Sequence, residues 1–405
     1  MNSTLAQTHI ARLLRHAPVQ AAMAGFEHEL AAAVDLIIAI QQVPAPTFAE
    51  AERAAFVEAR MRALGLADVA QDGLHNVYGR IPGRIPAARP VIVSAHTDTV
   101  FDAGVDLQVR RETHRVHGPG IGDNSAGVAG LLLLAQALRR HGLQPRADVW
   151  LVANVGEEGM GDLRGMRAVT ERFGERATYV VVEGGLFGQV CHQGIAVRRF
   201  RIDVTGPGGH SWGSFGTPSA IHVLGRLIAG IDGLSVPDAP RTTYNVGVIE
   251  GGTTINSIAR TASLWLDLRS EAGAALAELE TAVRQIIAGL AQRFPDVRIE
   301  TVLVGDRPAG QVARSEPVVA WAEAALRAVG FTDVSYIAGS TDTNIPLSRG
   351  IPAVCIGLAR SGNAHRPDEY LDTRQLPQGL SQLLLLVLAA AGLETPIPQE
   401  LETER

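Results

Sequence analysis

Residues 148–162, DVWLVANVGEEGMGD, join an apolar run to two adjacent glutamates that lie between glycines. The run 148–155 predicts a buried strand, and Glu157 and Glu158 follow at the point where that strand leaves the core. Two neighbouring carboxylates repel each other, and burial makes each of them harder to ionise. The pair therefore predicts positive charge nearby. Because adjacent side chains at a strand end point in different directions, it also predicts different roles for the two glutamates.

Strands and helices alternate on both sides of this stretch. The continuous β-branched run at 91–95 (VIVSA) predicts a strand that is covered on both faces. A helix at 126–140, the strand at 148–155, a helix at 163–173 and a strand at 177–185 follow it. This alternation predicts an α/β fold with a mainly parallel central sheet flanked by helices.

The pattern changes near residue 197, where the segment 197–206 (VRRFRIDVTG) alternates apolar and polar residues like a half-exposed antiparallel strand. The order that follows is helix, strand, strand, helix, strand, which is typical of a ferredoxin-like α+β domain. We therefore expect an inserted domain at 199–308, with the catalytic domain formed by 1–198 and 309–405.

Bulk properties exclude several functional classes. A chain of 405 residues should form more than one domain, and 46% hydrophobic residues can build a large core. The net charge of −6 gives no support for nucleic-acid binding, and no basic amphipathic face predicts a membrane surface. The apolar windows 127–138 and 380–393 are shorter than a membrane span and predict buried helices. With no apolar signal region at the N-terminus, a cytoplasmic protein is expected.

Five short stretches carry histidine or carboxylate side chains at predicted strand ends or on glycine-rich loops. Each has an ordinary structural interpretation, such as a helix N-cap for the aspartate in GPGIGDNSAG. Together they predict one cluster, because ligands bind beyond the carboxyl ends of parallel strands. Carboxylates with imidazoles and without thiolates suit zinc, cobalt or manganese. The members of this cluster are His96, Asp98, Asp123, Glu157, Glu158, Glu183 and His365.

The motifs that carry these residues resemble those of the M20 peptidase family of co-catalytic zinc hydrolases. They are HTDTV, GDNSAG, GEEG, VVEGG, GPGGHS and NAHRPDEY, and they occur in the family's order over about residues 25 to 395. The family includes carboxypeptidase-like, aminoacylase-like and peptidase-T-like members. The resemblance implies a zinc-exopeptidase-like catalytic domain, an inserted lid or dimerisation domain, and a homodimer formed through that domain.

The resemblance also implies a set of metal ligands. His96 and Glu183 are expected to bind one divalent ion, Glu158 and His365 to bind the other, and Asp123 to bridge the two. Both ions are expected to be Zn²⁺, with Co²⁺ or Mn²⁺ as alternatives.

The resemblance assigns roles to three further groups in the catalytic domain. Asp98 is expected to orient His96, and Glu157 is expected to act as the general base that moves a proton from water to the leaving nitrogen. The peptide bond between Asp123 and Asn124 is expected to be cis, as it often is in the family.

Residues of the inserted domain resemble the family's substrate-contacting groups. His210 in GPGGHS is expected to stabilise the oxyanion, reaching the active site from the partner subunit, although a turn histidine is the alternative. Asn256 and Arg269 form a family-like pair, and Arg307 resembles an arginine that binds a substrate carboxylate. Surface ion pairs are the alternative for both arginines. Thr341 in AGSTDTNIP lies in a loop that resembles a pocket-lining loop of the family.

The expected substrate is a small peptide or an N-acyl amino acid, cleaved at an amide bond. Glu183 stands where aminopeptidase-like members tend to have aspartate, which favours a carboxypeptidase, dipeptidase or aminoacylase reaction. Against this preference, the stretches around GDLRG and GGTTINSIA resemble peptidase-T-like homologues. One alternative is a non-catalytic binding protein on the same scaffold, but such a protein should have lost a ligand or the base. Another alternative is a cysteine hydrolase using Cys191 and His192, but adjacent side chains on a strand point apart.

Overall fold

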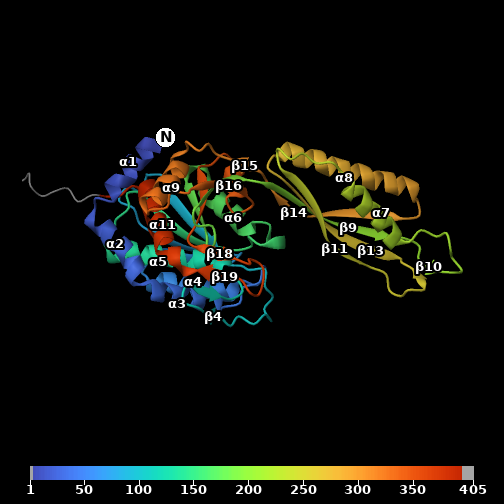
Figure 1. Ribbon diagram of the computed structural model, residues 1–405, viewed down its shortest axis with the longest axis horizontal. Coiled ribbons are helices and arrows are strands. Elements are labelled where there is room, and N and C mark those ends of the chain that lie inside the picture. Colours follow the sequence, from blue (N-terminus) through green and yellow to red (C-terminus); the bar gives the residue numbers. More distant parts are fainter. Residues whose placement is uncertain (1–2, 395–405) are drawn as a thin grey trace, which may run out of the picture. The chain divides into compact units, whose positions relative to one another are not determined.

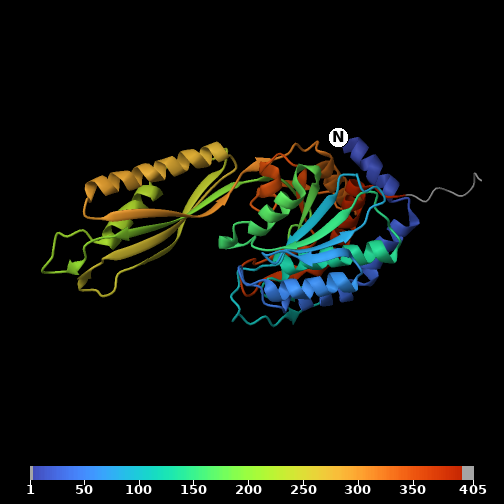
Figure 2. The same ribbon diagram turned by 180° about the vertical axis from the view of Figure 1, so that it is seen from behind.

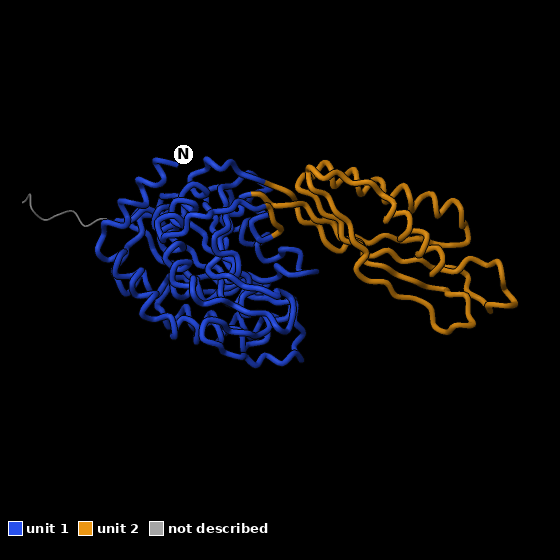
Figure 3. Tube along the Cα trace, in the orientation of Figure 1, with its two compact units in different colours: residues 1–192, 311–337, 341–405 blue, residues 193–310, 338–340 orange. Residues whose placement is uncertain are grey.

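The computed structural model describes residues 3–394, and the chain folds into two units (Figure 3). Unit 2 is inserted into unit 1, so the chain leaves unit 1 and returns to it. Unit 1 comprises residues 1–192, 311–337 and 341–405, and unit 2 comprises residues 193–310 and 338–340.

The boundaries of unit 2 differ from the expected range of 199–308. Residues 193–198 belong to it because its first strand already begins at Ala196, which pairs with Ser270. Residues 338–340 belong to it although they lie far along the chain, because the carbonyl of Gly339 accepts the backbone N–H of Ile195 at 3.0 Å. The sequence pattern did not predict that the chain returns to unit 2 at residues 338–340.

A nine-stranded sheet forms the centre of unit 1. Its order is β1 (Ala67–Gln71), β2 (Val77–Ile81), β6 (Val149–Asn154), β3 (Val91–His96), β7 (Thr178–Glu183), β17 (Ala353–Gly357), β8 (Gln189–Gly194) and β15 (Gly310–Gln311), with β16 (Ser335–Gly339) beside β8. The four strands β6, β3, β7 and β17 are parallel, whereas β1–β2, β2–β6 and β17–β8 pair antiparallel. The predicted α/β fold is confirmed, with parallel pairing concentrated in the central strands.

Helices cover the sheet of unit 1 on both faces (Figure 2). They are α1 (Ser3–Leu13), α2 (Ala17–His28), α3 (Leu30–Gln41), α4 (Ala51–Ala63), α5 (Ala126–Arg140), α6 (Arg164–Phe173), α9 (Pro317–Ala328), α10 (Asn344–Ser348) and α11 (Leu376–Ala391). Within the described residues, single helical turns accompany them at Gly159–Gly161, Gly174–Arg176 and Thr373–Gln375, and Ile121–Ser125 is an irregular turn in which Asp123 and Asn124 have non-helical backbone angles.

The central strands are apolar at every position because their side chains pack into two hydrophobic cores, one on each face of the sheet. Val91 and Val93 of β3 pack into one core with α5 and α11, whereas Ile92 packs into a second core with α6 and α10. Successive side chains of a strand point to opposite faces, so a strand that is covered on both faces must be apolar at every position. This is why the run at 91–95 shows no alternation.

The segment Ile121–Arg140, which contains α5, is long and apolar enough to cross a membrane. In the structure 89% of its apolar window is buried inside the fold, so it is a core helix of unit 1. A helix that is apolar on all sides is expected when other elements surround it.

A second, four-stranded sheet in unit 1 brings two loops together. Its order is β18 (Arg360–Gly362), β19 (Tyr370–Asp372), β5 (Arg115–His117) and β4 (Arg110–Arg111). Tyr370 of β19 pairs with His117 of β5. The loop before β19, which contains His365, and the loop after β5, which contains Asp123, are therefore attached to the same end of this strand pair.

Unit 2 has the predicted chain order of strand, helix, strand, strand, helix, strand (Figure 1). Its elements are β9 (Ala196–Thr205), α7 (Ala220–Asp232), β11 (Thr242–Gly251), β13 (Thr261–Ser270), α8 (Gly273–Arg293) and β14 (Arg298–Arg307). The antiparallel sheet has the order β11-β13-β9-β14, and both helices cover one of its faces. A separate ribbon of β10 (Gly209–His210) and β12 (Ser257–Ile258) was not expected from the sequence.

Candidate metal centre

The candidate ligands come from neighbouring strand ends in unit 1. His96 is the last residue of β3, and Glu183 is the last residue of the adjacent parallel strand β7. Glu157 and Glu158 follow β6 on the other side of β3, after a turn in which Gly156 has φ +68°. A positive φ of this size is easy for glycine and costly for other residues, so the glycine lets the strand turn sharply into the pair.

Asp123 lies between the two histidines. Its Oδ1 is 3.1 Å from Nε2 of His96, and its Oδ2 is 3.2 Å from Nε2 of His365. Glu183 Oε2 is 3.6 Å from the same nitrogen of His96, and Glu158 Oε1 is 3.0 Å from that of His365. The two oxygens of one carboxylate therefore face two separate imidazole–carboxylate pairs.

These donors fit two divalent cations. In each of the groups His96–Asp123–Glu183 and Asp123–Glu158–His365, one donor atom per residue lies within 4.8 Å of the others. The donors are carboxylate oxygens and imidazole nitrogens, and both free cysteines of the chain lie outside these groups. This donor set suits zinc, cobalt or manganese.

Charge and burial shift the pKa values within the cluster. Burial raises the pKa of Glu183 to about 7, and Asp123 and Asp342 add to that rise. Burial disfavours the charge of His96, but Glu183, Asp123 and Asp98 outweigh it and raise the pKa of this histidine well above its usual value. Hydrogen bonds to Asp123 and Glu158 raise the pKa of His365 to about 10. The carboxylates thus make a site that favours cations.

Asp98 joins the two halves of the cluster. Its Oδ1 accepts the backbone N–H of Glu157 and its Oδ2 accepts that of Glu158, each at 3.0 Å. The Nδ1 of His96 lies 3.1 Å from the carbonyl of Asp98 and 3.5 Å from its carboxylate. With Nδ1 donating in the neutral ring, the lone pair of Nε2 would be free to bind a cation on the side of Asp123; in the protonated ring, which the raised pKa of His96 favours, Nε2 donates to the Asp123 carboxylate. The sequence predicted that Asp98 contacts His96, but not that its carboxylate accepts hydrogen bonds from the backbone of Glu157 and Glu158.

The peptide bond between Asp123 and Asn124 is cis, as expected. The side chain of Asn124 donates to the carbonyl of Val182 at 2.9 Å and accepts the N–H of Gly127 at 3.0 Å. Since Val182 precedes Glu183, this contact ties the aspartate loop to the strand that carries a second candidate ligand.

Three supporting residues were not found from the sequence. Thr47 donates its hydroxyl to Oδ2 of Asp98 at 2.9 Å. Arg53 is buried and donates to the carbonyl of Thr97, between the histidine and the aspartate of the HTDTV motif. Glu369 accepts backbone N–H groups from the loop that carries Asp123. Of these three, only Glu369 was indicated by the sequence, because it lies in the acidic stretch downstream of His365.

The predicted residues of unit 2 lie at two ends of its sheet. The pairing of His210 with Ser257 and the bond from the N–H of Ser211 to the carbonyl of Asn256 bring His210 and Asn256 together. Arg269 and Arg307 lie opposite the same residue, Val197, on the two strands that flank β9. They therefore share one end and one face of the sheet.

The distance between these two groups is set by strand length. Thr261 begins β13 at the end where β12 enters, and Arg269 is eight positions further along the same strand. A strand rises about 3.3 Å per residue, so the two groups are roughly 25 Å apart within one copy of unit 2.

The hydrogen bonds of His210 fix the role of each ring nitrogen. Nδ1 accepts the backbone N–H groups of Trp212 and Gly213 at 3.2 and 3.3 Å. The neutral imidazole then carries its proton on Nε2. The ring is exposed, so Nε2 is available to donate to another molecule.

Thr341 lies in unit 1, in the turn that begins α10. Its backbone N–H donates to the side chain of Asn344 at 3.1 Å. The next residue, Asp342, accepts the side chain of Asn154 at 2.7 Å, and Asn154 ends the strand that leads to the glutamate pair. The loop is thus joined to the cluster through Asp342.

The structure gives no support for a cysteine hydrolase. Cys191 is only 1% exposed and lies opposite Cys355 across the β8–β17 pair. The Nδ1 of His192 lies 2.7 Å from the carbonyl of Val312. A nucleophile must reach its substrate and contact its base, and this pair is arranged for neither.

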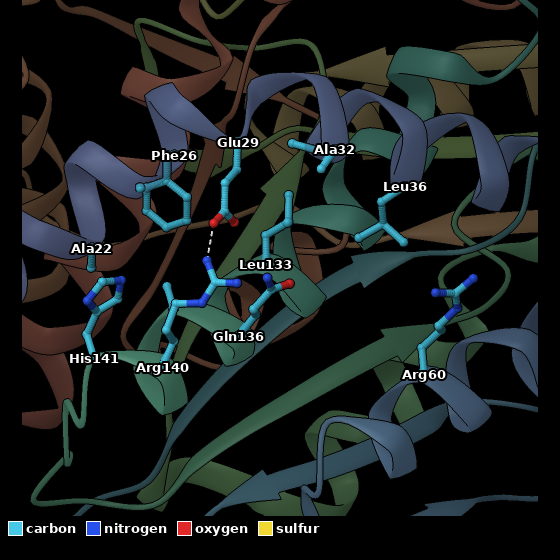
Figure 4. Close-up of a pocket in the computed structure, with 13 residues that line it drawn as sticks. Ala22, Phe26, Glu29, Ala32, Leu36, Arg60, Leu133, Gln136, Arg140 and His141 are labelled. Atoms are coloured by element: carbon cyan, nitrogen blue, oxygen red, sulfur yellow. Dashed lines mark hydrogen bonds and ion pairs between the residues drawn. The ribbon is translucent and has the colours of Figure 1, made fainter.

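A separate pocket of about 220 Å³ lies between α2, α3, α4 and α5 (Figure 4). Phe26, Leu36 and Leu133 line it, as do Glu29 and Arg140, which form an ion pair with each other. None of the candidate metal ligands lines this pocket, so it is not part of the centre.

Fold and cluster together define a class of hydrolases with an α/β peptidase domain and an inserted α+β domain. The chain belongs to the peptidase family M20/M25/M40, whose family model matches residues 92–389. The expected family is thereby confirmed.

Known proteins are similar to this chain over most of its length. Carboxypeptidase G2 of Pseudomonas sp. (strain RS-16) is 23% identical over 360 residues, which cover 84% of this chain and 81% of that protein. Acetylornithine deacetylase of Salmonella arizonae is 25% identical over 321 residues, covering 75% and 80%. The solved structure of aminopeptidase PepT from Bacillus cereus matches with a TM-score of 0.71 at 20% identity, covering 89% of this chain and 98% of that chain. The chain is a hydrolytic enzyme of the peptidase and amidohydrolase type.

Metal binding should release protons and strengthen as the pH rises. Metals bind neutral imidazole, and the pKa of His365 is raised to about 10, so at about pH 8 an ion must displace its proton. Below that pKa the affinity should rise by up to about tenfold per pH unit for each displaced proton. Calorimetric titration with Zn²⁺ in two buffers of different ionisation enthalpy measures the number released.

His365→Ala should lower the number of protons released, whereas His222→Ala, which changes an exposed histidine of unit 2, should not. A proton count that is the same for wild type and His365→Ala would contradict the assignment of His365 as a ligand.

Proposed function

We propose that this hydrolase uses two divalent metal ions, with Zn²⁺ as the expected metal, to cleave the amide bond of a small peptide or an N-acyl amino acid. The observation that carries the proposal is the position of Asp123, whose two carboxylate oxygens face His96 and His365 separately. His96 and Glu183 would hold one ion, Glu158 and His365 the other, and Asp123 both. When bound, the ions supply Lewis acidity that acidifies a water molecule and polarises the substrate carbonyl.

Glu157 is the proposed general base. It is 7% exposed and lies beside the ligand Glu158, and its backbone is held by Asp98. Its carboxylate would accept a proton from the attacking water and pass it to the leaving nitrogen. Asp98 would support both steps, because it fixes the position of the glutamate pair and the tautomer of His96.

The complete set of proposed ligands and the base is present, which argues against a non-catalytic binding protein. The two curated relatives are named a carboxypeptidase and an acetylornithine deacetylase, and both names fit a substrate that contains an amino acid. We accordingly place peptides and N-acyl amino acids first among the candidates. A cytoplasmic location remains part of the proposal.

His210 is proposed to stabilise the oxyanion in the active site of a partner subunit. Nε2 carries the proton of its neutral ring, as an oxyanion donor requires. Within one copy of unit 2 it is roughly 25 Å from the arginines proposed to bind the same substrate. A homodimer would supply the two groups from different chains.

Arg307 is proposed to bind the free carboxylate of the substrate, with Arg269 on the same face of the sheet. Arg307 is 4% exposed and donates to the hydroxyl of Ser340 at 3.0 Å, so its guanidinium is held in place. Arg269 pairs with Asp267 and lines a cavity of about 220 Å³ in unit 2 together with Arg241. Asn256 and Thr341 are proposed as further substrate contacts.

Removal of metal should abolish hydrolysis, and Glu157→Gln should slow it strongly with the metal in place. Chelator-treated protein should regain amine release from dipeptides or N-acyl amino acids when Zn²⁺ or Co²⁺ is added. The Glu157→Gln variant should bind two ions per chain like wild type, while kcat falls by a factor of about 10²–10⁴.

Glu112→Gln, which changes an exposed carboxylate of unit 1, is the control and should keep full activity. If Glu157→Gln retained nearly wild-type kcat on the same substrate, the base would have to be another group. If the chelated protein kept its activity, the metal-dependent mechanism would be wrong.

Co-expressed His210→Ala and Glu157→Gln chains should recover activity that neither variant has alone. In a mixed two-fold dimer, the chain with an intact Glu157 receives an intact His210 from its partner. Random pairing should therefore restore about a quarter of the wild-type activity. Steady-state rates and sedimentation velocity of the purified mixture measure recovery and assembly. No recovery from a confirmed mixed dimer would show that His210 acts within its own chain.

Arg307→Lys should weaken binding only of substrates that carry a free carboxylate. Lysine keeps the charge but loses the two-pronged geometry of the guanidinium. A lost charge-assisted hydrogen bond is worth about 1.5–3 kcal/mol, so KM should rise roughly 10- to 100-fold. Initial rates on a substrate and on its C-terminal amide measure the difference, with Arg201→Lys as the control. An equal rise in KM for both compounds would contradict carboxylate binding.

A further inference from the structure

Glu369 is fully buried, and its side chain makes three hydrogen bonds to a single loop. Oε1 accepts the backbone N–H groups of Gly122 at 2.7 Å and of Asp123 at 2.8 Å. Oε2 accepts the N–H of Gly120 at 3.1 Å. One carboxylate therefore satisfies three donors in the turn that presents the proposed bridging ligand.

The loop is shaped to receive this carboxylate. A Cβ atom on Gly122 would lie 3.0 Å from Oε1 of Glu369 and 2.8 Å from Cβ of Ser361, so only glycine fits there without displacement. Buried N–H groups are costly when they have no acceptor. Without the carboxylate, the turn would have to rearrange to find other acceptors or water, and Asp123 would move with it.

Glu369 also belongs to the segment that carries the ligand of the other proposed ion. His365 and Glu369 lie in the same connection between β18 and β19, and the N–H of Glu369 donates to the carbonyl of Arg366 at 3.0 Å. The main chain adds a further link, because the carbonyl of Glu369 accepts the N–H of Gly118 at 2.9 Å. Side chain and backbone of one residue thus join the aspartate loop to the histidine loop.

We propose that Glu369 is a positioning residue that holds Asp123 between the two metal sites and fixes its loop to the loop of His365. This inference rests on the proposed two-metal function and adds a residue that acts through the bridging ligand. Residues that orient metal ligands typically contribute a factor of 10–100 to metal affinity. Loss of Glu369 should affect both ions, because Asp123 faces both histidines.

Glu369→Ala should lower the affinity for divalent ions about 10- to 100-fold and change the visible absorption spectrum of the Co²⁺-loaded protein. Glu369→Gln should have a smaller effect. Its amide oxygen can still accept from Gly122 and Asp123, but its NH₂ group would face the N–H of Gly120. The measurements are competition of Zn²⁺ against a chromophoric chelator, the Co²⁺ spectrum, and the thermal midpoint of the chelated protein.

Asp372→Asn is the matched control, since Asp372 is a 4% exposed carboxylate three residues further along the chain, at the end of β19. Its side chain pairs with Arg374, and among the interactions of the described residues it makes no contact with the loop that carries Asp123. It should leave metal affinity and the Co²⁺ spectrum unchanged. Wild-type affinity and spectrum in both Glu369 variants would overturn the proposal, as would a lower thermal midpoint without a change in affinity. Failure of the wild type itself to bind divalent ions would instead refute the proposed function.

Discussion

The carboxylate of Asp123 between two imidazoles is the constraint on which the rest of unit 1 depends. Its oxygens lie 3.1 and 3.2 Å from His96 and His365, which come from parts of the chain more than two hundred residues apart. Carboxylates gathered this closely repel one another and are costly to bury. Two divalent cations would offset that cost. The parallel strands β6, β3 and β7 end side by side, which brings the candidate ligands that follow or end them close together.

Two further carboxylates support the candidate ligands, and each accepts hydrogen bonds from the backbone of the segment that carries them. Asp98 accepts the N–H groups of Glu157 and Glu158, and Glu369 accepts those around Asp123. Ligand side chains move when their backbone moves, so such anchors limit the positions that the donors can adopt. The positions of the candidate donors therefore depend on these two backbone anchors as well as on the five side chains themselves.

Unit 2 carries its proposed substrate-contacting residues near opposite ends of its four-stranded sheet. His210 and Asn256 lie near the β10–β12 ribbon, whereas Arg269 and Arg307 flank β9 where the chain enters the sheet. Strands of ten residues separate the two groups by a length that no small substrate spans. This separation gives the proposed exchange of His210 between subunits a physical reason.

The sequence by itself determined the alternation of elements, the inserted domain, the family and the residues with ionisable side chains at strand ends. These features depend on local periodicity and on motifs, which a single chain displays directly. Tertiary structure decided which atoms meet: the anchoring of Asp123 by Glu369, the hold of Asp98 on the glutamate pair, and the return of residues 338–340 to unit 2. Those contacts join positions that are distant in the chain. In the sequence each is represented only by single polar residues, whose partners cannot be identified until the fold places the segments side by side.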